Sequence, residues 1–418
     1  SILRLLGLKG IDSLKPFHLL QTKISNIPLM ISRTGFTGDL GYEIFVQNGI
    51  ANKIIEKVWN ANPYWTATNL YPQDQKVENY LTLRGNGREV ELGSFLNPEE
   101  RIEIKNKIDS IFWVRDQINT PALDKSPEDF IQNVNNLVDS SSIKVEVFDQ
   151  KWLEENNFGG VLGVAKGSDR APYLVVGKYN EKAKYQISLI GKGVLFDSGG
   201  YSLKSPAGME TMKTDMSGAA SAWGVINLVA RTKQNIGLTV YTPIVENMVS
   251  GSAIRPGDVL KARNGKTIEV LNTDAEGRLI MADALAYAAE TGPDLICDIA
   301  TLTGASYVAL GLDIGAVFSN NKDIESKFIE AAKFTYEDFH SLPLYSKYRK
   351  LIDSDLADMK NTGGRFGGAI TAALLLEEFV GDNNWMHLDI AGPARSDNRK
   401  GATGFGVLSL YEYFKNIS

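Results

Sequence analysis

The chain has 418 residues, a formal net charge of −6 and 43% hydrophobic residues. This length allows two or more domains, and the acidic balance argues against general nucleic-acid binding. No apolar run reaches the roughly 18 residues of a membrane span. The single cysteine, Cys297, excludes an intrachain disulfide and indicates a reducing, cytoplasmic setting.

Residues 1–61 predict a short, atypical α+β segment. The stretch IPLMISRTGFTGDLGYEIFV (27–46) reads as a strand, a glycine-rich turn and a second strand, and a helix is expected over 48–61. The motif SRTGFTGDLGYEIFV resembles the folate-dependent aminomethyltransferase family of the glycine cleavage system, although the catalytic and most folate-binding portions of that family are absent. Two short strands and a helix are too little to enclose a large, flat ligand. We therefore expect a fused, rearranged or misassembled fragment that binds no folate.

Residues 62–104 contain no recognisable motif, and we expect a linker or the remnant of an N-terminal region. Helical patterns follow within 100–158, and Ser126 is expected to cap the second of them. This stretch predicts the helical entry to a catalytic domain over 105–418.

The remainder of the chain alternates between strand-like and helix-like stretches. Strands are expected over 185–196, 238–245, 294–302 and 386–392, and helices over 217–233, 278–290, 370–380 and 404–416. This alternation predicts an α/β catalytic domain with a mixed, mostly parallel central sheet that is covered by helices on both faces.

Four carboxylates and three basic residues lie in three glycine-flanked segments between residues 191 and 279. They are Lys192, Asp197, Lys204, Asp215, Asp274, Glu276 and Arg278. If the stretch around Asp274, Glu276 and Arg278 is extended, these three side chains point to one face. Two acids and a guanidinium are rarely buried in a hydrophobic core, but they suit a site that holds metal ions beside an anion.

Charge counting predicts two metal ions at these residues. Four carboxylates contribute about −4, which two divalent cations would neutralise. Oxygen-rich ligand sets suit Mg²⁺ and Mn²⁺, and Asp and Glu also bind Zn²⁺. The chain has only three histidines and one cysteine, which argues against a His- or Cys-based site. Solvated loops or salt bridges to the nearby lysines are the alternative, which we favour for any single acid but not for the whole set.

The octapeptide NTDAEGRL (272–279) resembles the signature of the leucyl aminopeptidase family, the cytosolic two-metal aminopeptidases. Six further segments resemble the family in the same order. They are INTPA (118–122), GSDRAPYLV (167–175), ENMVSGSAIRPGDVL (246–260), DIATLTGA (298–305), ADMKNTGGRFGGAITAA (357–373) and WMHLDIAGPA (385–394). The resemblance covers about residues 105–418, or three quarters of the chain.

The resemblance implies a role for each acid. Lys192, Asp197, Asp215 and Glu276 would ligate the tighter-held metal ion. Asp197, Asp274 and Glu276 would ligate the more exchangeable ion, so that Asp197 and Glu276 bridge the two. A lysine ligates a metal only as the neutral amine, so an adjacent dication must lower the pKa of Lys192 far below its usual value. The ions implied are Zn or Mn, with Mg or Co as alternatives.

Two basic residues would be catalytic according to the same resemblance. Lys204 would stay charged and polarise the substrate carbonyl, which stabilises the oxyanion of a tetrahedral intermediate. Arg278 would hold a bicarbonate ion that serves as general base. No Ser–His–Asp or Cys–His arrangement lies near these segments.

Three other features are expected to have structural roles or are left open. Cys297 reads as a small core residue, and His387 as a hydrogen-bonded core residue rather than a ligand. The glycine-rich stretch NTGGRFGG (361–368) predicts either a flexible loop at the mouth of the site or an ordinary surface loop.

The leading prediction is a dinuclear metallo-aminopeptidase that hydrolyses the N-terminal peptide bond by attack of a metal-bridging hydroxide. By resemblance we expect a preference for leucine or another hydrophobic first residue, and a cytoplasmic homohexamer that acts on peptides, without membrane or nucleic-acid partners. Two alternatives are folate-dependent one-carbon (aminomethyl) transfer by residues 27–46 and a non-catalytic DNA-binding relative. The complete ligand set argues against the second.

Overall fold

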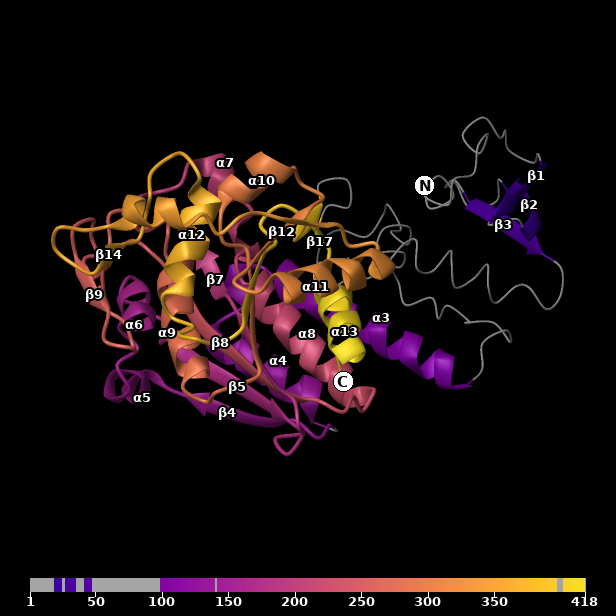
Figure 1. The fold of residues 1–418 in the computed structure, drawn as a ribbon, viewed down its shortest axis with the longest axis horizontal. Coiled ribbons are helices and arrows are strands. Elements are labelled where there is room, and N and C mark those ends of the chain that lie inside the picture. The colour runs from indigo at the N-terminus through magenta and orange to yellow at the C-terminus, as the bar shows by residue number, and fades with distance from the viewer. Residues whose placement is uncertain are drawn as a thin grey trace.

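The computed structural model describes residues 19–24, 27–34, 41–46, 98–139, 141–396 and 401–417. Nine strands between residues 144 and 389 form one sheet, and part of this sheet is seen in Figure 1. They are β4 (Lys144–Phe148), β5 (Tyr173–Tyr179), β6 (Gln186–Gly191), β7 (Gly193–Asp197), β8 (Gly237–Asn247), β11 (Leu295–Ala300), β12 (Gly315–Ser319), β13 (Phe339–Ser341) and β15 (Trp385–Asp389).

The strand order is β13-β12-β15-β11-β6-β8-β5-β4, and β7 also pairs with β8. The pairings in the centre of the sheet, β15–β11, β11–β6, β6–β8 and β7–β8, are parallel, as is β12–β13. The pairings β4–β5, β5–β8 and β12–β15 are antiparallel. The predicted mixed, mostly parallel sheet is therefore confirmed.

Eleven helices are described in the catalytic part. They are α3 (Pro98–Asn119), α4 (Pro127–Val138), α5 (Gln150–Glu155), α6 (Gly159–Ala165), α7 (Pro206–Met209), α8 (Ser217–Arg231), α9 (Gly277–Ala289), α10 (Gly304–Leu310), α11 (Lys322–Thr335), α12 (Gly368–Glu377) and α13 (Val407–Ile417). Three 3₁₀ turns, η3 (Ala122–Asp124), η4 (Met212–Thr214) and η5 (Ser346–Ile352), connect them. The predicted helices correspond to α3, α4, α8, α9, α12 and α13 within a few residues.

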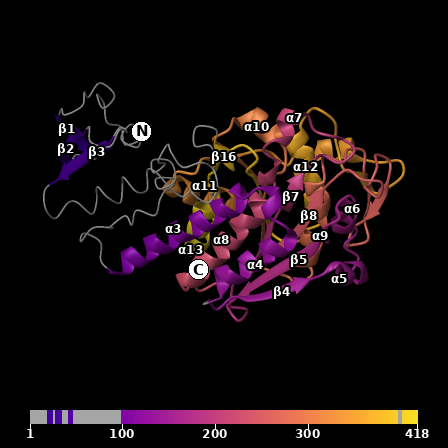
Figure 2. The same ribbon diagram turned by 180° about the vertical axis from the view of Figure 1, so that it is seen from behind.

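Helices cover both faces of the sheet. Neighbouring residues of a strand point to opposite sides, and apolar residues on both sides of the strands pack in a core. On β11, Cys297 packs in the core that contains side chains of α3, α4, α8, α11 and α13. Its neighbour Ile296 packs in the other core, with side chains of α5, α6, α9 and α12. In Figure 2, α3 and α4 are seen with α8, against which both pack.

Two details of the catalytic domain follow from local contacts. Ser126 caps α4, since its hydroxyl accepts the amide of Asp129 at 3.1 Å and its own amide donates to the Asp129 carboxylate at 2.9 Å. The single strand predicted over 185–196 is instead divided at Lys192 into β6 and β7. The amide of Lys192 donates to the Ile299 carbonyl at 3.2 Å, and its carbonyl accepts the Ala219 amide at 2.8 Å. These bonds draw the backbone away from β8 at this residue.

Two small sheets lie outside the nine-stranded sheet in the described residues 259–402. A three-stranded sheet contains β9 (Val259–Lys261), β10 (Thr267–Glu269) and β14 (Met359–Lys360), and β16 (Arg395–Ser396) pairs with β17 (Gly401–Ala402). In the part of the chain that the structure describes, no helix has both the length and the apolar content to cross a membrane.

The N-terminal segment contributes an antiparallel sheet of β1 (Leu19–Ile24), β2 (Ile27–Thr34) and β3 (Gly41–Val46). The predicted pair of strands corresponds to β2 and β3, whereas β1 was not predicted. The helix expected over 48–61 and most of 62–104 lie outside the described residues. The domain boundaries at 61 and 104 therefore stay predictions, and α3 begins a few residues before the second.

Replacing Gly218 with alanine should destabilise the catalytic domain. The added Cβ would lie 2.1 Å from the Ile299 carbonyl oxygen, and overpacking of this kind typically costs about 1–3 kcal/mol. We expect a loss of about that size in the free energy of unfolding, measured by denaturant titration. Gly251→Ala is the matched control, because nothing lies within 4 Å of its added Cβ. Equal stability of the two variants would contradict the close packing of α8 on β11.

Candidate metal centre

The candidate site lies at the carboxyl ends of the central parallel strands, where open α/β sheets bind their ligands. Lys192 follows β6, Asp197 ends β7, Asn247 ends β8 and Thr301 follows β11. Because these strands run in the same direction, their last residues converge on one edge of the sheet. The remaining site residues come from the loops and helix starts that follow this edge.

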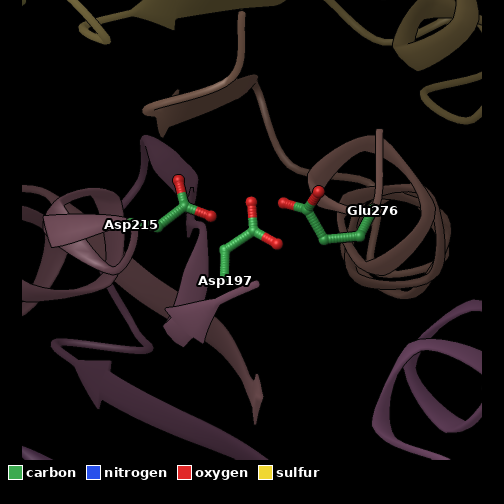
Figure 3. Close-up of side chains that lie close together, drawn as sticks. All are labelled: Asp197, Asp215 and Glu276. Atoms are coloured by element: carbon green, nitrogen blue, oxygen red, sulfur yellow. The ribbon is translucent and has the colours of Figure 1, made fainter. Parts of the chain in front are cut away.

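Three buried acids converge at this edge. Asp197, Asp215 and Glu276 are at most 5% exposed, and each offers an oxygen atom within 4.8 Å of those of the others. Figure 3 shows the three carboxylates pointing toward one another from three different segments. They come from the end of β7, from the turn between η4 and α8, and from the residue before α9. Their atoms are close enough to share a metal ion.

The two predicted lysines lie within this cluster. Lys192 is 3% exposed, and its Nζ lies 2.8 Å from both Asp215 Oδ1 and Glu276 Oε1. Lys204 Nζ lies 2.7 Å from Asp197 Oδ2 and also contacts Asp274. The structure therefore brings six of the seven predicted residues into one charged network, with Asp274 at its more exposed side.

Burial and mutual repulsion disfavour the charged carboxylates. Burial, followed by the Glu276 charge, raises the pKa of Asp197 to about 6 despite Lys204 and Lys192. Burial also raises the pKa of Asp215 well above its usual range, against the effect of Lys192. A dication at this position would oppose both shifts, because it stabilises the charged form of each acid.

In Lys192 and Glu276, by contrast, neighbouring opposite charges outweigh burial and favour the charged form. Burial lowers the pKa of Lys192, but Asp215, Glu276 and Asp197 together raise it above its ordinary value. Burial raises the pKa of Glu276, but the charges of Lys192 and Lys204 lower it by more than burial raises it. Its pKa therefore lies below the ordinary value, and Glu276 stays ionised. Within the protein alone, the lysines therefore act as the counter-charges of the acids.

One atom of the cluster supports metal binding directly. Asp215 Oδ2 is buried and has no hydrogen-bond partner among the described residues. Asp215 Oδ1, by contrast, accepts from Lys192 Nζ and, at 2.8 Å, from Thr301 Oγ1. A buried acceptor without a donor is unfavourable, and a coordinated cation would satisfy it. The donor set of carboxylate oxygens and one amine nitrogen fits a divalent ion.

Arg278 departs from the sequence prediction. The stretch around it is not extended, because Glu276 already has helical dihedral angles (φ −74°, ψ −35°) and Arg278 lies in the first turn of α9. The condition for a one-face arrangement of Asp274, Glu276 and Arg278 is therefore not met, although both acids still reach the cluster.

The Arg278 side chain is buried and lies beside the glycine-rich loop. Its Nη1 donates to the Asn361 carbonyl at 2.7 Å, and its Nε has no hydrogen-bond partner in the described part of the chain. Burial lowers its pKa to about 10, against the effects of Glu276 and Asp389. Arg278 therefore stays a cation at neutral pH and keeps a buried donor for an anion.

Asn361 is a site residue that the sequence prediction missed. It is fully buried, and its Oδ1 accepts the amide of Leu271 at 2.9 Å while its Nδ2 donates to the Asn272 carbonyl at 2.6 Å. These bonds fix the turn that carries Asp274 and Glu276. The glycines of residues 361–368 predicted a loop, but the first residue of that loop, Asn361, stabilises the turn of the site by hydrogen bonds.

Asn247 was also missed. Its Nδ2 donates to Asp197 Oδ1 at 2.8 Å and to the Thr273 carbonyl at 3.0 Å, so it connects two of the site segments. The available signal was a polar side chain two positions after the apolar strand LTVYTPIV (238–245). Gly277 was missed as well. It leaves room for the Lys192 side chain, since a Cβ added at Gly277 would lie 2.5 Å from Lys192 Cε.

The two residues expected to be structural are indeed in the core. Cys297 is a buried free thiol. His387 is buried beside Asp298, with 2.5 Å between His387 Nδ1 and Asp298 Oδ1, and Trp385 Nε1 donates to the same carboxylate at 2.8 Å. The interpretation of His387 as a hydrogen-bonded core residue is confirmed.

Comparison with known proteins identifies relatives of most of the chain. The model of the cytosol aminopeptidase family, catalytic domain, matches residues 112–411. A probable cytosol aminopeptidase of Clostridium perfringens is 42% identical over 82% of this chain and 72% of the relative. One from Chloroherpeton thalassium is 46% identical over 72% of this chain and 61% of the relative. The chain thus spans about six to seven tenths of these relatives' length.

Solved structures agree in fold. The cytosol aminopeptidase from Coxiella burnetii is 35% identical with a TM-score of 0.77, over 87% of this chain and 78% of that one. The bottromycin maturation enzyme BotP in complex with Mn is 32% identical with a TM-score of 0.77, over 87% of this chain and 80% of that one.

The N-terminal part matches other family models. Residues 9–68 match the GCVT N-terminal domain, which agrees with the predicted resemblance to the glycine cleavage aminomethyltransferases. Residues 44–111 match a family described as integral membrane protein (DUF2244). The second of these matches overlaps α3, which begins at Pro98.

The predicted resemblance to the leucyl aminopeptidases is confirmed, and with it, at the level of the family, the metal-dependent aminopeptidase chemistry. The family model covers well over half of the chain, and the buried acids lie inside it. The chain belongs to the cytosol aminopeptidase family, and residues 112–411 are its catalytic domain.

Proposed function

We propose that this chain removes the N-terminal residue from peptides at the cluster of Asp197, Asp215 and Glu276. The observation that carries the proposal is this buried group of carboxylates, in which one oxygen of Asp215 lacks a partner among the described residues. A preference for leucine or another hydrophobic first residue, a homohexameric assembly and a cytoplasmic location are further parts of the proposal, and they rest on the family resemblance.

The proposed ligands form two overlapping sets. Lys192, Asp197, Asp215 and Glu276 would hold one ion, and Asp197, Asp274 and Glu276 would hold the other. Zn or Mn is proposed, with Mg or Co as alternatives. When bound, the two ions supply Lewis acidity and lower the pKa of coordinated water. The spacing of the buried oxygens and the ion pairs of both lysines with these acids support this arrangement.

Lys204 is proposed to stabilise the charge that develops on the substrate carbonyl. Burial lowers its pKa, but Asp197 and Glu276 raise it more, so the pKa lies above its ordinary value and the amine stays charged. Its side chain is 16% exposed and lies between Asp197 and the more open Asp274. A fixed ammonium at the accessible side of the cluster can meet the oxyanion without reorganisation.

Arg278 is proposed to hold a bicarbonate ion that acts as general base. Its Nη1 is used by the Asn361 carbonyl, whereas Nε is buried without a partner among the described residues. The guanidinium can therefore orient a small planar anion next to Glu276, and such an anion can take the proton that water loses during attack.

Specificity for the N-terminal residue follows from the chemistry of the proposed site. The free α-amine of a peptide is an additional ligand that internal peptide bonds lack. The neighbouring carboxylates favour a substrate that carries this amine, and Asp274 is the most exposed of them. The proposal therefore predicts exopeptidase rather than endopeptidase activity.

Substituting the shared acid should abolish activity. Glu276→Ala removes a carboxylate proposed to bind both ions, and Asp274→Ala removes one that binds the second, so each should eliminate nearly all hydrolysis of a leucyl amide. A chelator should have the same effect on the unaltered chain, and added Mn²⁺ or Zn²⁺ should reverse it. Glu330→Ala, at an exposed acid on α11, is the control. Full activity of Glu276→Ala would disprove the two-metal assignment.

Substituting Lys204 should reduce turnover without loss of metal. Removing one donor to the oxyanion typically lowers kcat by about 10²–10³-fold, and we expect this of Lys204→Ala in a steady-state assay on a leucyl amide. Metal content, measured by elemental analysis of the same sample, should equal that of the unaltered chain. Loss of metal in this variant would show that Lys204 holds the ligand carboxylates in position instead of acting on the substrate.

Metal binding should release protons and should therefore become tighter as pH rises. The acids hold the pKa of Lys192 above its usual value, whereas ligation requires the neutral amine. Affinity then increases about tenfold per pH unit for each proton released. Calorimetry of Mn²⁺ binding at pH 8 in two buffers of different ionisation enthalpy should report at least one proton per chain. Lys204→Ala should release the same number, and release of none would exclude Lys192 as a ligand.

A further inference from the structure

Three of the motif segments supply none of the proposed ligands, yet they meet beside the metal centre. These segments are 118–122, 167–175 and 246–260. The first segment contains the end of α3, and the 3₁₀ turn η4 directly precedes Asp215. Hydrogen bonds of Lys125, Arg170 and Lys213 connect the segments and this turn into a continuous set of contacts behind the ligands.

Lys125 lies at the centre of these contacts. Its side chain is only 1% exposed, and burial, followed by the nearby Lys213, lowers its pKa to about 7. Burying an amine is costly unless it is hydrogen-bonded. Lys125 Nζ donates to the Gln117 carbonyl at 3.1 Å and to the Lys213 carbonyl at 2.8 Å. The first acceptor is one of the helix-end carbonyls that have no partner within α3.

A second bond joins the same two segments in the opposite direction. Lys213 Nζ donates to the Asn119 carbonyl at 2.6 Å. The turn η4 is therefore held at two points against the last turn of α3. The amide of Asp215 donates to the Met212 carbonyl at 3.3 Å, so the ligand residue is itself part of the turn that these bonds fix.

Arg170 extends the contacts to the other side of the metal centre. Its Nη1 donates to the Ala122 carbonyl at 3.0 Å and pairs with Glu246 Oε1 at 2.8 Å. Ala122 lies three residues before Lys125, and Glu246 precedes Asn247, whose amide group donates to Asp197. The contacts therefore extend from the turn that precedes Asp215 to Asn247, which donates to Asp197.

We propose that Lys125 and Arg170 are positioning residues of the metal centre. Lys125 fixes the turn before Asp215, and Arg170 connects that region to the end of β8 beside Asp197. Neither residue is one of the proposed metal ligands. The inference rests on the proposed metal site, and groups that orient ligands in this way typically change metal affinity by about 10–100-fold when they are removed.

The test uses Mn²⁺ alone as the probe and the full chain as the protein. The electron paramagnetic resonance signal of free Mn²⁺ reports binding without any measurement of activity. Lys125→Met keeps the length and apolar body of the side chain but removes both donated bonds, and we expect affinity to fall about 10–100-fold. Lys151→Met, at a lysine with an 80% exposed side chain on α5, should bind like the unaltered chain.

Arg170→Met is the second variant and keeps the proposal testable if Lys125→Met does not fold. It should weaken Mn²⁺ binding in the same direction, and the double variant should lose less affinity than the product of the two single losses, because both residues act through one set of contacts. Amide hydrogen exchange of the metal-free variants should be faster at residues 212–216 than in the unaltered chain, while α13 is unchanged.

Two results would overturn the inference. If the unaltered chain binds Mn²⁺ and both variants bind it equally well, Lys125 and Arg170 do not position the ligands. If exchange increases equally throughout the catalytic domain, their role is general stability. Failure of the unaltered chain to bind Mn²⁺ would instead overturn the proposed function, and this inference with it.

Discussion

The structure depends on a concentration of negative charge at the carboxyl edge of the sheet. Asp197, Asp215 and Glu276 are buried within 4.8 Å of one another, an arrangement that is unfavourable unless cations compensate it. Lys192 and Lys204 provide that compensation within the protein. The two lysines differ in exposure, because Lys192 is enclosed among the acids and Lys204 lies at their more accessible side. The electrostatics of the site and the proposed chemistry both follow from this cluster.

Much of the fold could be predicted because its signals are local. Apolar β-branched runs gave the central strands, and small or apolar residues between them gave helices such as α8 and α9. The break in the predicted strand at Lys192 could not be found in this way. It depends on backbone bonds to Ile299 and Ala219, which lie far from Lys192 in sequence or in another element. The polar character of a lysine within an apolar run was the only local indication.

The candidate site was predictable in composition but not in geometry. The acids and lysines are polar residues in an apolar, glycine-rich context, so they could be named from the sequence. The one-face arrangement considered for Asp274, Glu276 and Arg278 required an extended segment. The segment is not extended, because Asn361 folds the preceding turn from a distant loop. Arg170 lies in a motif segment, but the roles of Lys125 and Arg170 could not be read from the sequence, since their partners become neighbours only in the folded chain. The prediction that residues 1–61 bind no folate concerns a part of the chain that is mostly outside the described residues.

Anomalous diffraction from crystals of the full chain grown with Mn²⁺ would test the central claim most directly, with data collected on both sides of the manganese absorption edge. The account predicts two peaks per chain, both in contact with Asp197 and Glu276, one of them also beside Lys192 and Asp215. A single peak that contacts none of these residues, or no peak at a concentration that supports peptide hydrolysis, would contradict the assignment of this cluster as the catalytic metal centre.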